Sequence, residues 1–275
     1  MYDIIVVGGG HAGIEAAAAG PKLGCKTLLV SLDKNKIGAL SCNPAVGGVG
    51  KGQLVKEVDA LGGLMGEITD QVAIQYRCLN SSRGPAVHSS RMQVDMEKYP
   101  VEAQRRLAGI KGLEVTEDEA VAVGQEKGFV TGVVLKAAGP VRARTVILTP
   151  GTFFHGLIHI GEKHFSGGRM DDPASDQLPE NLAGLGLKLG RFKTGTTPRL
   201  KGDTIDFSVL SEQPGDSAFI TFSRRTKNAP VLEQRPCFLG RTSQITHKII
   251  RDNLKRSALY SGIIKGTGVR YCPSL

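Results

Sequence analysis

The sequence lacks any apolar run long enough to cross a membrane. It also lacks a secretory signal, because the first residues lead straight into a predicted strand rather than into a charged segment and an apolar core. With 275 residues, 40% of them hydrophobic, the chain can bury a sizeable core and divide into one or two domains. We therefore expect a soluble, cytoplasmic protein that does not bind a membrane.

Cysteine is scarce, and the spacing of the cysteines matches no recognisable pattern of disulfide bonds or metal ligands. The chain has five cysteines, an odd number, and no C-x-x-C pair. This pattern disfavours a secreted disulfide framework, a zinc ribbon and a dithiol redox centre. Three histidines, His155, His159 and His164, lie close together in the sequence, but no acid or cysteine joins them at the spacing of metal ligands. We predict no metal site.

Acidic residues are missing from two stretches of the second half. Residues 188–201 contain five lysines and arginines and no acid, and residues 241–270 contain seven against Asp252 alone. The whole chain has 35 basic and 26 acidic residues, for a formal net charge of +9. An anionic partner such as RNA is expected, with Lys193 and Arg199 as the best candidates for phosphate contacts, although a solvated basic surface would have the same composition.

A third stretch without acids, residues 71–94, lies in the first half of the chain. It contains Arg77, Arg83 and Arg91, around a loop of the type that interrupts regular structure. Composition alone supports an anion site and a solvated surface about equally.

The strongest motif is the glycine turn, which we define as residues 8–13. A β-branched run, Ile4 to Val7, predicts a buried parallel strand, and a helix is predicted directly after the glycines. Between them, Gly8, Gly10 and Gly13 have the spacing G-x-G-x-x-G. In dinucleotide-binding folds these three glycines permit a tight turn, the approach of a pyrophosphate, and close packing of helix on strand. The helix amides and the helix dipole then face the phosphates.

The rest of the first half continues the same pattern. A second strand is expected at residues 26–32, an antiparallel meander at 115–134, and another buried strand at 145–149. The first helix is expected to end or kink near Ala19, because Pro21 removes a backbone donor. This order predicts an α/β fold, namely a doubly wound, Rossmann-like FAD-binding domain with an inserted antiparallel meander and the beginning of a second inserted domain.

Several longer motifs, found in order along the whole chain, resemble the MnmG (GidA) family. They are G-G-G-H-A-G at 8–13, S-C-N-P-A-V-G-G-V-G-K-G at 41–52, V-K-E-V-D-A-L-G-G-L-M at 55–65, G-P-A-V at 84–87, S-G-G-R at 166–169, K-T-G-T-T-P-R at 193–199, I-D-F-S-V-L at 205–210 and R-Y-C-P-S at 270–274. The segment around Cys42 and the last motif are specific to this family.

The resemblance implies an FAD-dependent enzyme that acts on tRNA. Such enzymes add an aminomethyl or carboxymethylaminomethyl group to C5 of the wobble uridine (U34). The carbon comes from methylenetetrahydrofolate, NADH is the reductant, and the GTPase MnmE is the partner. The full-length family implies a homodimer within a heterotetramer. A related folate- and FAD-dependent tRNA uracil-C5 methyltransferase is the alternative enzyme, although His11 and the S-C-N-P motif argue against it.

The resemblance also implies residue roles. FAD contacts are implied at Gly8, Gly9, Gly10, His11, Ala12, Gly13, Ala120 and Ser175, and an NAD-associated segment at Gly268, Val269, Arg270, Tyr271, Cys272, Pro273, Ser274 and Leu275.

A thiolate suits addition to C6 of uracil, which would activate C5 as a nucleophile. Cys42, in a glycine-rich loop near Lys51, and Cys272, beside Arg270, are the two candidates for this catalytic role, and each could instead be a packing residue.

The family continues for more than the same length beyond R-Y-C-P-S. We therefore expect an N-terminal portion, with residues 1–198 as an incomplete FAD-binding domain and 199–275 as the start of an inserted NAD- and tRNA-facing domain. The alternative to an active enzyme is accordingly a non-catalytic, FAD-binding fragment.

Overall fold

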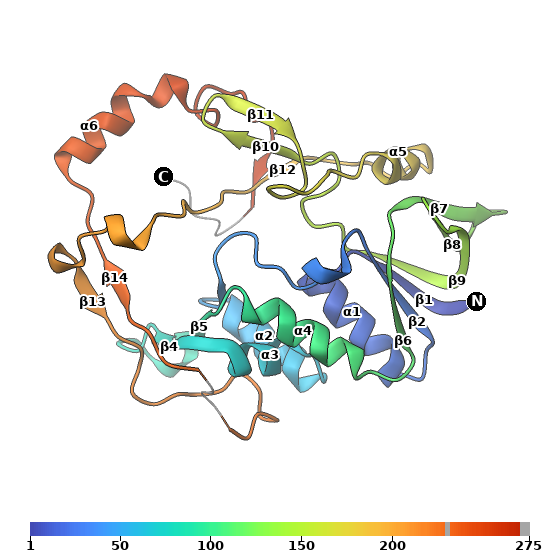
Figure 1. The fold of residues 1–275 in the computed structure, drawn as a ribbon, viewed down its shortest axis with the longest axis horizontal. Helices are drawn as coiled ribbons and strands as arrows, with labels where there is room; N and C mark the ends of the chain where they lie inside the picture. Colours follow the sequence, from blue (N-terminus) through green and yellow to red (C-terminus); the bar gives the residue numbers. More distant parts are fainter. Residues whose placement is uncertain (229–231, 270–275) are drawn as a thin grey trace. The chain divides into compact units, whose positions relative to one another are not determined.

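A computed structural model describes residues 1–228 and 232–269 of the chain (Figure 1). It contains two compact units. Unit 1 comprises residues 1–151 and 213–237, and unit 2 comprises residues 152–212 and 238–275. Each unit is described by itself below. The division into compact units reflects packing within the chain and does not show which residues bind ligands. The functional boundary at residue 199 therefore stays a prediction.

The centre of unit 1 is a six-stranded sheet with the strand order β6-β2-β1-β9-β8-β7. The first four strands are parallel, and β8 and β7 continue the sheet in antiparallel pairing. The order of the parallel strands is that of a doubly wound nucleotide-binding fold, so the predicted fold class is confirmed. The bounds are β1 (Tyr2–Val7), β2 (Thr27–Ser31), β6 (Leu113–Glu117), β7 (Ala120–Glu126), β8 (Phe129–Leu135) and β9 (Gly139–Leu148).

One strand, β9, contains what the sequence suggested were separate elements. Its first residues pair with β8, from Leu135↔Gly139 to Gly132↔Arg142, and its last residues pair with β1, through Val7↔Leu148. The expected meander is present as β7, β8 and β9, with its turn at Lys127 and Gly128. The expected start of the meander at Val115 is wrong, because Val115 lies in β6 and pairs in parallel with β2.

Helix α1 (His11–Lys22) connects β1 to β2 and does not end at Ala19. Pro21 lies in its last turn, where a proline costs only one intrahelical bond, so the expected termination is wrong. The helix packs on the sheet through small side chains, and Ala17 and Ala18 are buried. At Gly20 an added Cβ would come 2.3 Å from Thr27 Oγ1, so the last turn of α1 lies directly on β2.

A second sheet of unit 1 has the order β3-β5-β4 and is antiparallel. One of its faces packs with helices around a shared core that includes Val46, Tyr76 and Met92. The elements are β3 (Ala45–Gly47), α2 (Lys51–Ala60), α3 (Met65–Val72), β4 (Ala73–Leu79), β5 (Ser89–Val94) and α4 (Lys98–Ala108), with short 3-10 turns η1 (Lys34–Lys36) and η2 (Pro85–Val87).

Unit 1 is completed by a distant segment, residues 213–237, which closes over the second sheet and α3. The buried carboxylate of Asp70 accepts hydrogen bonds from Phe222 N at 2.8 Å, Ser223 N at 3.0 Å and Thr226 Oγ1 at 2.7 Å. Arg225 forms ion pairs with Asp59 at 2.7 Å and with Glu67 at 2.9 Å. Burial raises the pKa of Asp70, and the three donors oppose that rise.

Unit 2 consists of short elements and long connections. It contains β10 (Leu157–Ile160) and β11 (Lys163–Ser166), which form a hairpin, and β12 (Phe192–Lys193) with β15 (Thr267–Gly268), which pair in parallel. Strands β13 (Ser211–Gln213) and β14 (Cys237–Leu239) pair where the chain passes between units. The helices are α5 (Gln177–Gly184) and α6 (Gln244–Asp252), with 3-10 turns η3 (Gly202–Thr204), η4 (Phe207–Val209) and η5 (Leu254–Arg256). Among the described residues of both units, no helix has the length and apolar character needed to span a membrane.

Candidate functional site

The glycine turn lies between β1 and α1, and two of its glycines are required by packing. Gly8 has φ +108°, and an added Cβ there would come 2.3 Å from the carbonyl oxygen of Thr149. An added Cβ at Gly13 would come 1.8 Å from the carbonyl oxygen of Gly8. These are the positions that the sequence assigned to the tight turn and to the close approach of helix and strand.

Gly10 differs from these two because its surroundings are open. No atom lies within 4 Å of a Cβ built there, although its backbone is extended (φ −75°, ψ −174°) and would tolerate a side chain. Gly10 is also the N-cap of α1, without a side-chain hydrogen bond to the cap. Within residues 1–228 and 232–269, no protein atom accepts a hydrogen bond from the amides of Gly9 to Gly13. The turn therefore presents free donors beside an open space at a helix N-terminus, which suits a phosphate.

His11 begins α1 and turns its ring toward the helix layer. The imidazole packs edge-on against Tyr99, with ring centroids 5.5 Å apart and an angle of 81° between the planes. Burial lowers the pKa of His11, and its Nδ1 is buried without a hydrogen-bond partner. The ring is therefore held neutral against the core, beside the free amides of the turn.

Two predicted site segments lie at the same edge of the six-stranded sheet. Gly38 N donates to Gly9 O at 2.9 Å, so the loop that carries Cys42 starts at the glycine turn (Figure 1). Cys42 itself is partly exposed in irregular backbone. On the other side, Glu117 pairs with Ser31 at the end of β2, and the chain reaches the buried Ala120 three residues later. The fold thus brings Ala120 and the start of the Cys42 loop to the carboxyl ends of β1 and β2.

A second glycine-rich segment, residues 47–52, precedes α2. Here the backbone groups are used within the protein: Gly48 N donates to Ser90 O at 2.9 Å, and Lys51 N and Gly52 N donate to Gly48 O at 3.0 and 2.7 Å. An added Cβ at Gly52 would come 2.6 Å from Ser90 O. This loop is fixed against β5 by packing, and it does not have the phosphate-binding spacing of a P-loop.

Sequence reasoning placed Thr149 at the end of a predicted strand but missed its contact with the glycine turn; in the structure Thr149 directly follows β9. Its hydroxyl donates toward Val7 O at 2.9 Å and Gly8 O at 3.1 Å, and its amide donates to Val7 O at 2.9 Å. It therefore fixes the first residues of the glycine turn. The available signal was a hydroxyl residue directly after the returning buried strand, before Pro150-Gly151.

The remaining predicted site residues fall in unit 2. Ser175 is buried and bridges to Phe154, with its amide donating to Phe153 O at 2.9 Å. Lys193, predicted to contact RNA, pairs with Gly268, predicted to begin the NAD-associated segment, so two expected sites meet in one small sheet. Arg199 is exposed and donates to Thr197 Oγ1 at 2.6 Å. Val269 is exposed, whereas Arg270, Tyr271, Cys272, Pro273, Ser274 and Leu275 lie outside the described residues.

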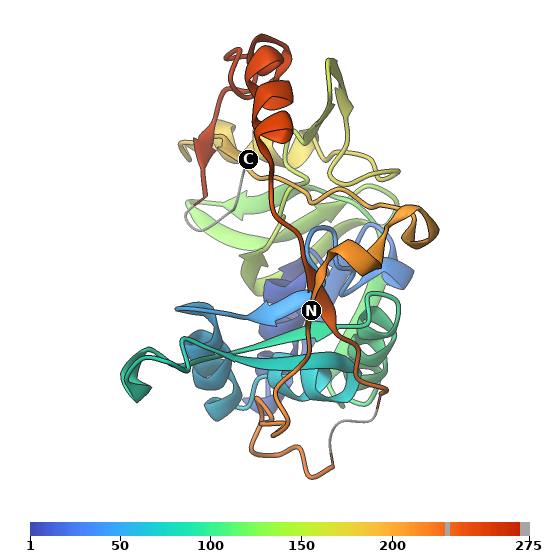
Figure 2. The same cartoon turned by 90° about the vertical axis from the view of Figure 1, so that its left-hand side faces the viewer.

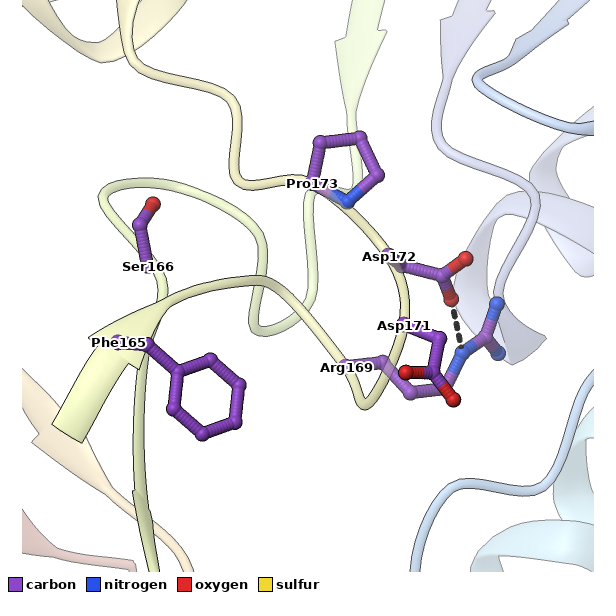
Figure 3. Close-up of a pocket in the computed structure, with 6 residues that line it drawn as sticks. All are labelled: Phe165, Ser166, Arg169, Asp171, Asp172 and Pro173. Carbon is purple, nitrogen blue, oxygen red and sulfur yellow. Dashed lines mark hydrogen bonds and ion pairs between the residues drawn. The ribbon is translucent and has the colours of Figure 1, made fainter. Parts of the chain in front are cut away.

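Unit 2 also contains a shallow pocket of about 320 Å³ beside the S-G-G-R motif (Figure 3). Arg169 donates to Asp172 at 2.6 Å across it, and Phe165 and Pro173 line it. Asp171 also lines the pocket, so its charged groups are one arginine and two carboxylates, which does not suit an anionic ligand. No group of three or more potential metal ligands is found in the described parts of either unit.

Comparisons with known proteins agree with the fold. The family model "Glucose inhibited division protein A" matches residues 3–275. A Wolinella succinogenes protein named tRNA uridine 5-carboxymethylaminomethyl modification enzyme MnmG is 47% identical over 277 residues, covering 100% of this chain and 44% of that protein. A Chlamydia trachomatis protein of the same name is 48% identical, with 100% and 45% covered. The chain thus spans less than half the length of these curated relatives.

The solved structure of Aquifex aeolicus GidA is similar to this chain throughout the described fold. The two superpose with a TM-score of 0.92 at 43% identity, covering 99% of this chain and 46% of that one. The glycine turn, the doubly wound sheet and the match along nearly the whole sequence lead to one conclusion. This chain belongs to the glucose inhibited division protein A (GidA, MnmG) family, of which it represents the N-terminal portion.

Proposed function

We propose that this chain is the FAD-binding part of an enzyme that modifies C5 of the wobble uridine (U34) of tRNA. One observation carries the proposal: the amides of Gly9 to Gly13 have no protein acceptor in the described residues, and the space at Gly10 is open. The names of the curated relatives, which are tRNA uridine modification enzymes, supply the reaction class.

The residues of the glycine turn fit the diphosphate of FAD. Gly8 and Gly13 shape the turn, Gly10 leaves room for phosphate oxygens, and the amides at the start of α1 donate to them. Ala120, at the neighbouring strand end, would contact the adenosine half. FAD would supply redox chemistry when bound, with NADH as its reductant, and the protein positions the groups around it.

Cys42 is the proposed nucleophile within the described residues. Its sulfur would form a bond to C6 of the uracil, and the electron pair of the C5–C6 double bond would move into an enolate at C4. C5 then attacks the methylene carbon of an iminium form of methylenetetrahydrofolate, and the electron pair of its C=N double bond moves to the folate nitrogen. Loss of the C5 proton to a base and departure of the thiolate from C6 restore the ring. Cys272 remains the other proposed candidate.

The proposed partners follow from the family. Lys193 and Arg199 would contact tRNA phosphates, and Gly268 and Val269 would begin the NAD-associated segment. Assembly with the GTPase MnmE, as a homodimer within a heterotetramer, and a cytoplasmic location are proposed for the full-length protein.

The test is a titration of the chain with FAD, followed by flavin fluorescence. We expect saturable binding, and we expect Gly10→Ala to weaken it by about tenfold or more, because the new methyl group occupies phosphate space. Gly84→Ala, at another site where a built Cβ meets nothing within 4 Å, is the control. Equal affinity of wild type and Gly10→Ala would refute the proposed site.

Incubation with NADH and with an unmodified tRNA then separates the enzyme from its alternatives. Bleaching of bound FAD by NADH is expected of a competent enzyme, whereas weak FAD binding without NADH oxidation is expected of a non-catalytic fragment. A 5-methyluridine product would favour the uracil-C5 methyltransferase reaction.

A further inference from the structure

Two arginines from the acid-free stretch 71–94 lie directly opposite each other in the second sheet of unit 1. Arg77 on β4 pairs in register with Arg91 on β5, and Arg91 pairs with Gly47 on β3. Directly opposed residues of an antiparallel pair have Cα atoms about 5 Å apart and project from the same face of the sheet. The two guanidinium groups therefore share one face.

This face is the one turned away from the helices. The neighbouring pair Tyr76 and Met92 is buried in the core with α2, α3 and α4. Because side chains alternate along a strand, Arg77 and Arg91 point to the other face, together with the pair Gln75 and Gln93. At these positions the face carries two guanidinium groups and two amides, and the amide of the buried Gln75 is already bonded to Gln213 O and Cys237 Sγ.

Neither guanidinium group has a hydrogen-bond or ion-pair partner among residues 1–228 and 232–269. The Nε of Arg77 is buried and makes no hydrogen bond, and no carboxylate in the described residues pairs with Arg77 or Arg91. Both side chains are partly buried. Like charges directly opposed on a sheet are destabilising, and a buried donor without an acceptor adds a desolvation cost. An anion between the two guanidinium groups removes both costs.

We infer that Arg77 and Arg91 form an anion site for a phosphate group on the outer face of the β3-β5-β4 sheet. A phosphate carries up to two negative charges, which matches two arginines, and its oxygens can accept from both guanidinium forks at once. A carboxylate offers one charge and two oxygens, so it leaves part of this donor set unused. The site lies on a different sheet from the glycine turn and does not depend on the proposed function.

The test is calorimetric titration of the chain with inorganic phosphate in chloride buffer, with thermal unfolding as a second readout. We expect saturable binding and a higher Tm in phosphate. The double variant R77Q/R91Q should bind phosphate at least about tenfold more weakly, as expected for the loss of charge-assisted hydrogen bonds. Its Tm in phosphate-free buffer should equal or exceed that of the wild type, because the opposed charges are gone.

Matched variants separate this site from other basic groups. The turn between β4 and β5 is exposed (Figure 2), and Arg83→Gln within it removes one positive charge, half the change of the double variant, so it should leave the phosphate affinity within about twofold. Arg91→Lys keeps the charge but loses the planar fork, so it should bind phosphate with an intermediate affinity, and it serves if the double variant does not fold.

The source of the phosphate is identified with a fluorescent oligouridylate of twelve nucleotides. If R77Q/R91Q weakens its binding and lowers the salt slope by about two, the phosphate belongs to an RNA backbone. If RNA binding is unchanged while phosphate binding is lost, the ligand is a small phosphorylated molecule. Wild-type affinity for phosphate in R77Q/R91Q or in Arg91→Lys, or no saturable binding to the wild type, would overturn the site.

Discussion

The two glycine-rich turns of unit 1 look alike in the sequence but are built differently. Each contains a glycine N-cap without a side-chain hydrogen bond, Gly10 for α1 and Gly50 for α2, and continues into the first turn of its helix. Among the described residues the amides of Gly9 to Gly13 have no acceptor and the space at Gly10 is open, whereas in residues 47–52 the amides of Gly48, Lys51 and Gly52 donate to Ser90 O or to Gly48 O. Glycine content therefore does not identify a ligand site. The distinguishing property is whether the backbone donors are already satisfied.

The largest expected effect comes from Gly13→Ala, because the new Cβ would overlap the carbonyl oxygen of Gly8. Helix α1 must move away from β1, and we expect the free energy of unfolding to fall by about 3 kcal/mol, with loss of FAD binding. Chemical denaturation followed by circular dichroism measures the first effect. Gly109→Ala, where a Cβ makes ordinary contacts, is the control. A stable Gly13→Ala variant would contradict the packing role.

Gly52→Ala tests the other turn in the same way. Its Cβ would come 2.6 Å from Ser90 O and 2.7 Å from Ser89 Oγ, and we expect a loss of about 2 kcal/mol in unfolding free energy. The folded fraction should still bind FAD, because no amide of the glycine turn is affected. A loss of FAD affinity without a loss of stability would show that residues 47–52 also contact the ligand.

Gly50→Ala separates the two N-caps. Gly50 has φ +73°, a left-handed conformation that costs a residue with a Cβ about 1.5 kcal/mol, whereas Gly10 has an extended backbone. We expect Gly50→Ala to lower stability without changing FAD affinity, and Gly10→Ala to do the opposite. Chemical denaturation and FAD titration of the same samples measure the two effects. Loss of both stability and FAD affinity in either variant would contradict this separation of roles.

The smallest expected effect is a pH dependence at His11, which occupies the first helical position of α1, as Lys51 does in α2. Because burial lowers the pKa of His11, the unfolded state binds a proton near pH 6.5 while the folded state resists it. The His11 contribution to stability is present above pH 6.5 and is lost as the pH falls toward the folded pKa. Between pH 7 and 5.5 the wild type should lose about 0.5–1 kcal/mol more than His11→Asn. Parallel pH curves for the two proteins would show that His11 does not titrate in this way.

Local patterns were sufficient to predict the glycine turn and the strand and helix on either side of it. A β-branched strand, a fixed glycine spacing and a following helix are all contained within residues 3–19, so the roles of Gly8 and Gly13 could be assigned from sequence. The contact of Thr149 with the turn could not, because it requires β9 to lie beside β1. The continuity of β9 was missed for the same reason, since one strand pairs with two partners that are distant in sequence.

The sequence also could not show which charged side chains lie next to one another, or next to hydrogen-bond donors, in the fold. The acid-free stretch 71–94 was visible, but the opposition of Arg77 and Arg91 depends on the register of β4 and β5. Likewise, no feature of the sequence near Asp70 indicates that the hydrogen-bond donors to its carboxylate are Phe222, Ser223 and Thr226. These features depend on register and on long-range docking, which composition and periodicity do not encode.

The docking of residues 213–237 has a consequence for how the protein is made. Phe222 belongs to the core of unit 1, and the only donors recorded for the Asp70 carboxylate among the described residues come from this segment. A ribosome synthesises the first 151 residues well before the segment that completes their packing. While residues 152–212 emerge, the nascent unit lacks the donors of the Asp70 carboxylate, and the apolar surface that Phe222 covers is exposed. That interval is when a chaperone would find its most accessible binding surface on the growing chain.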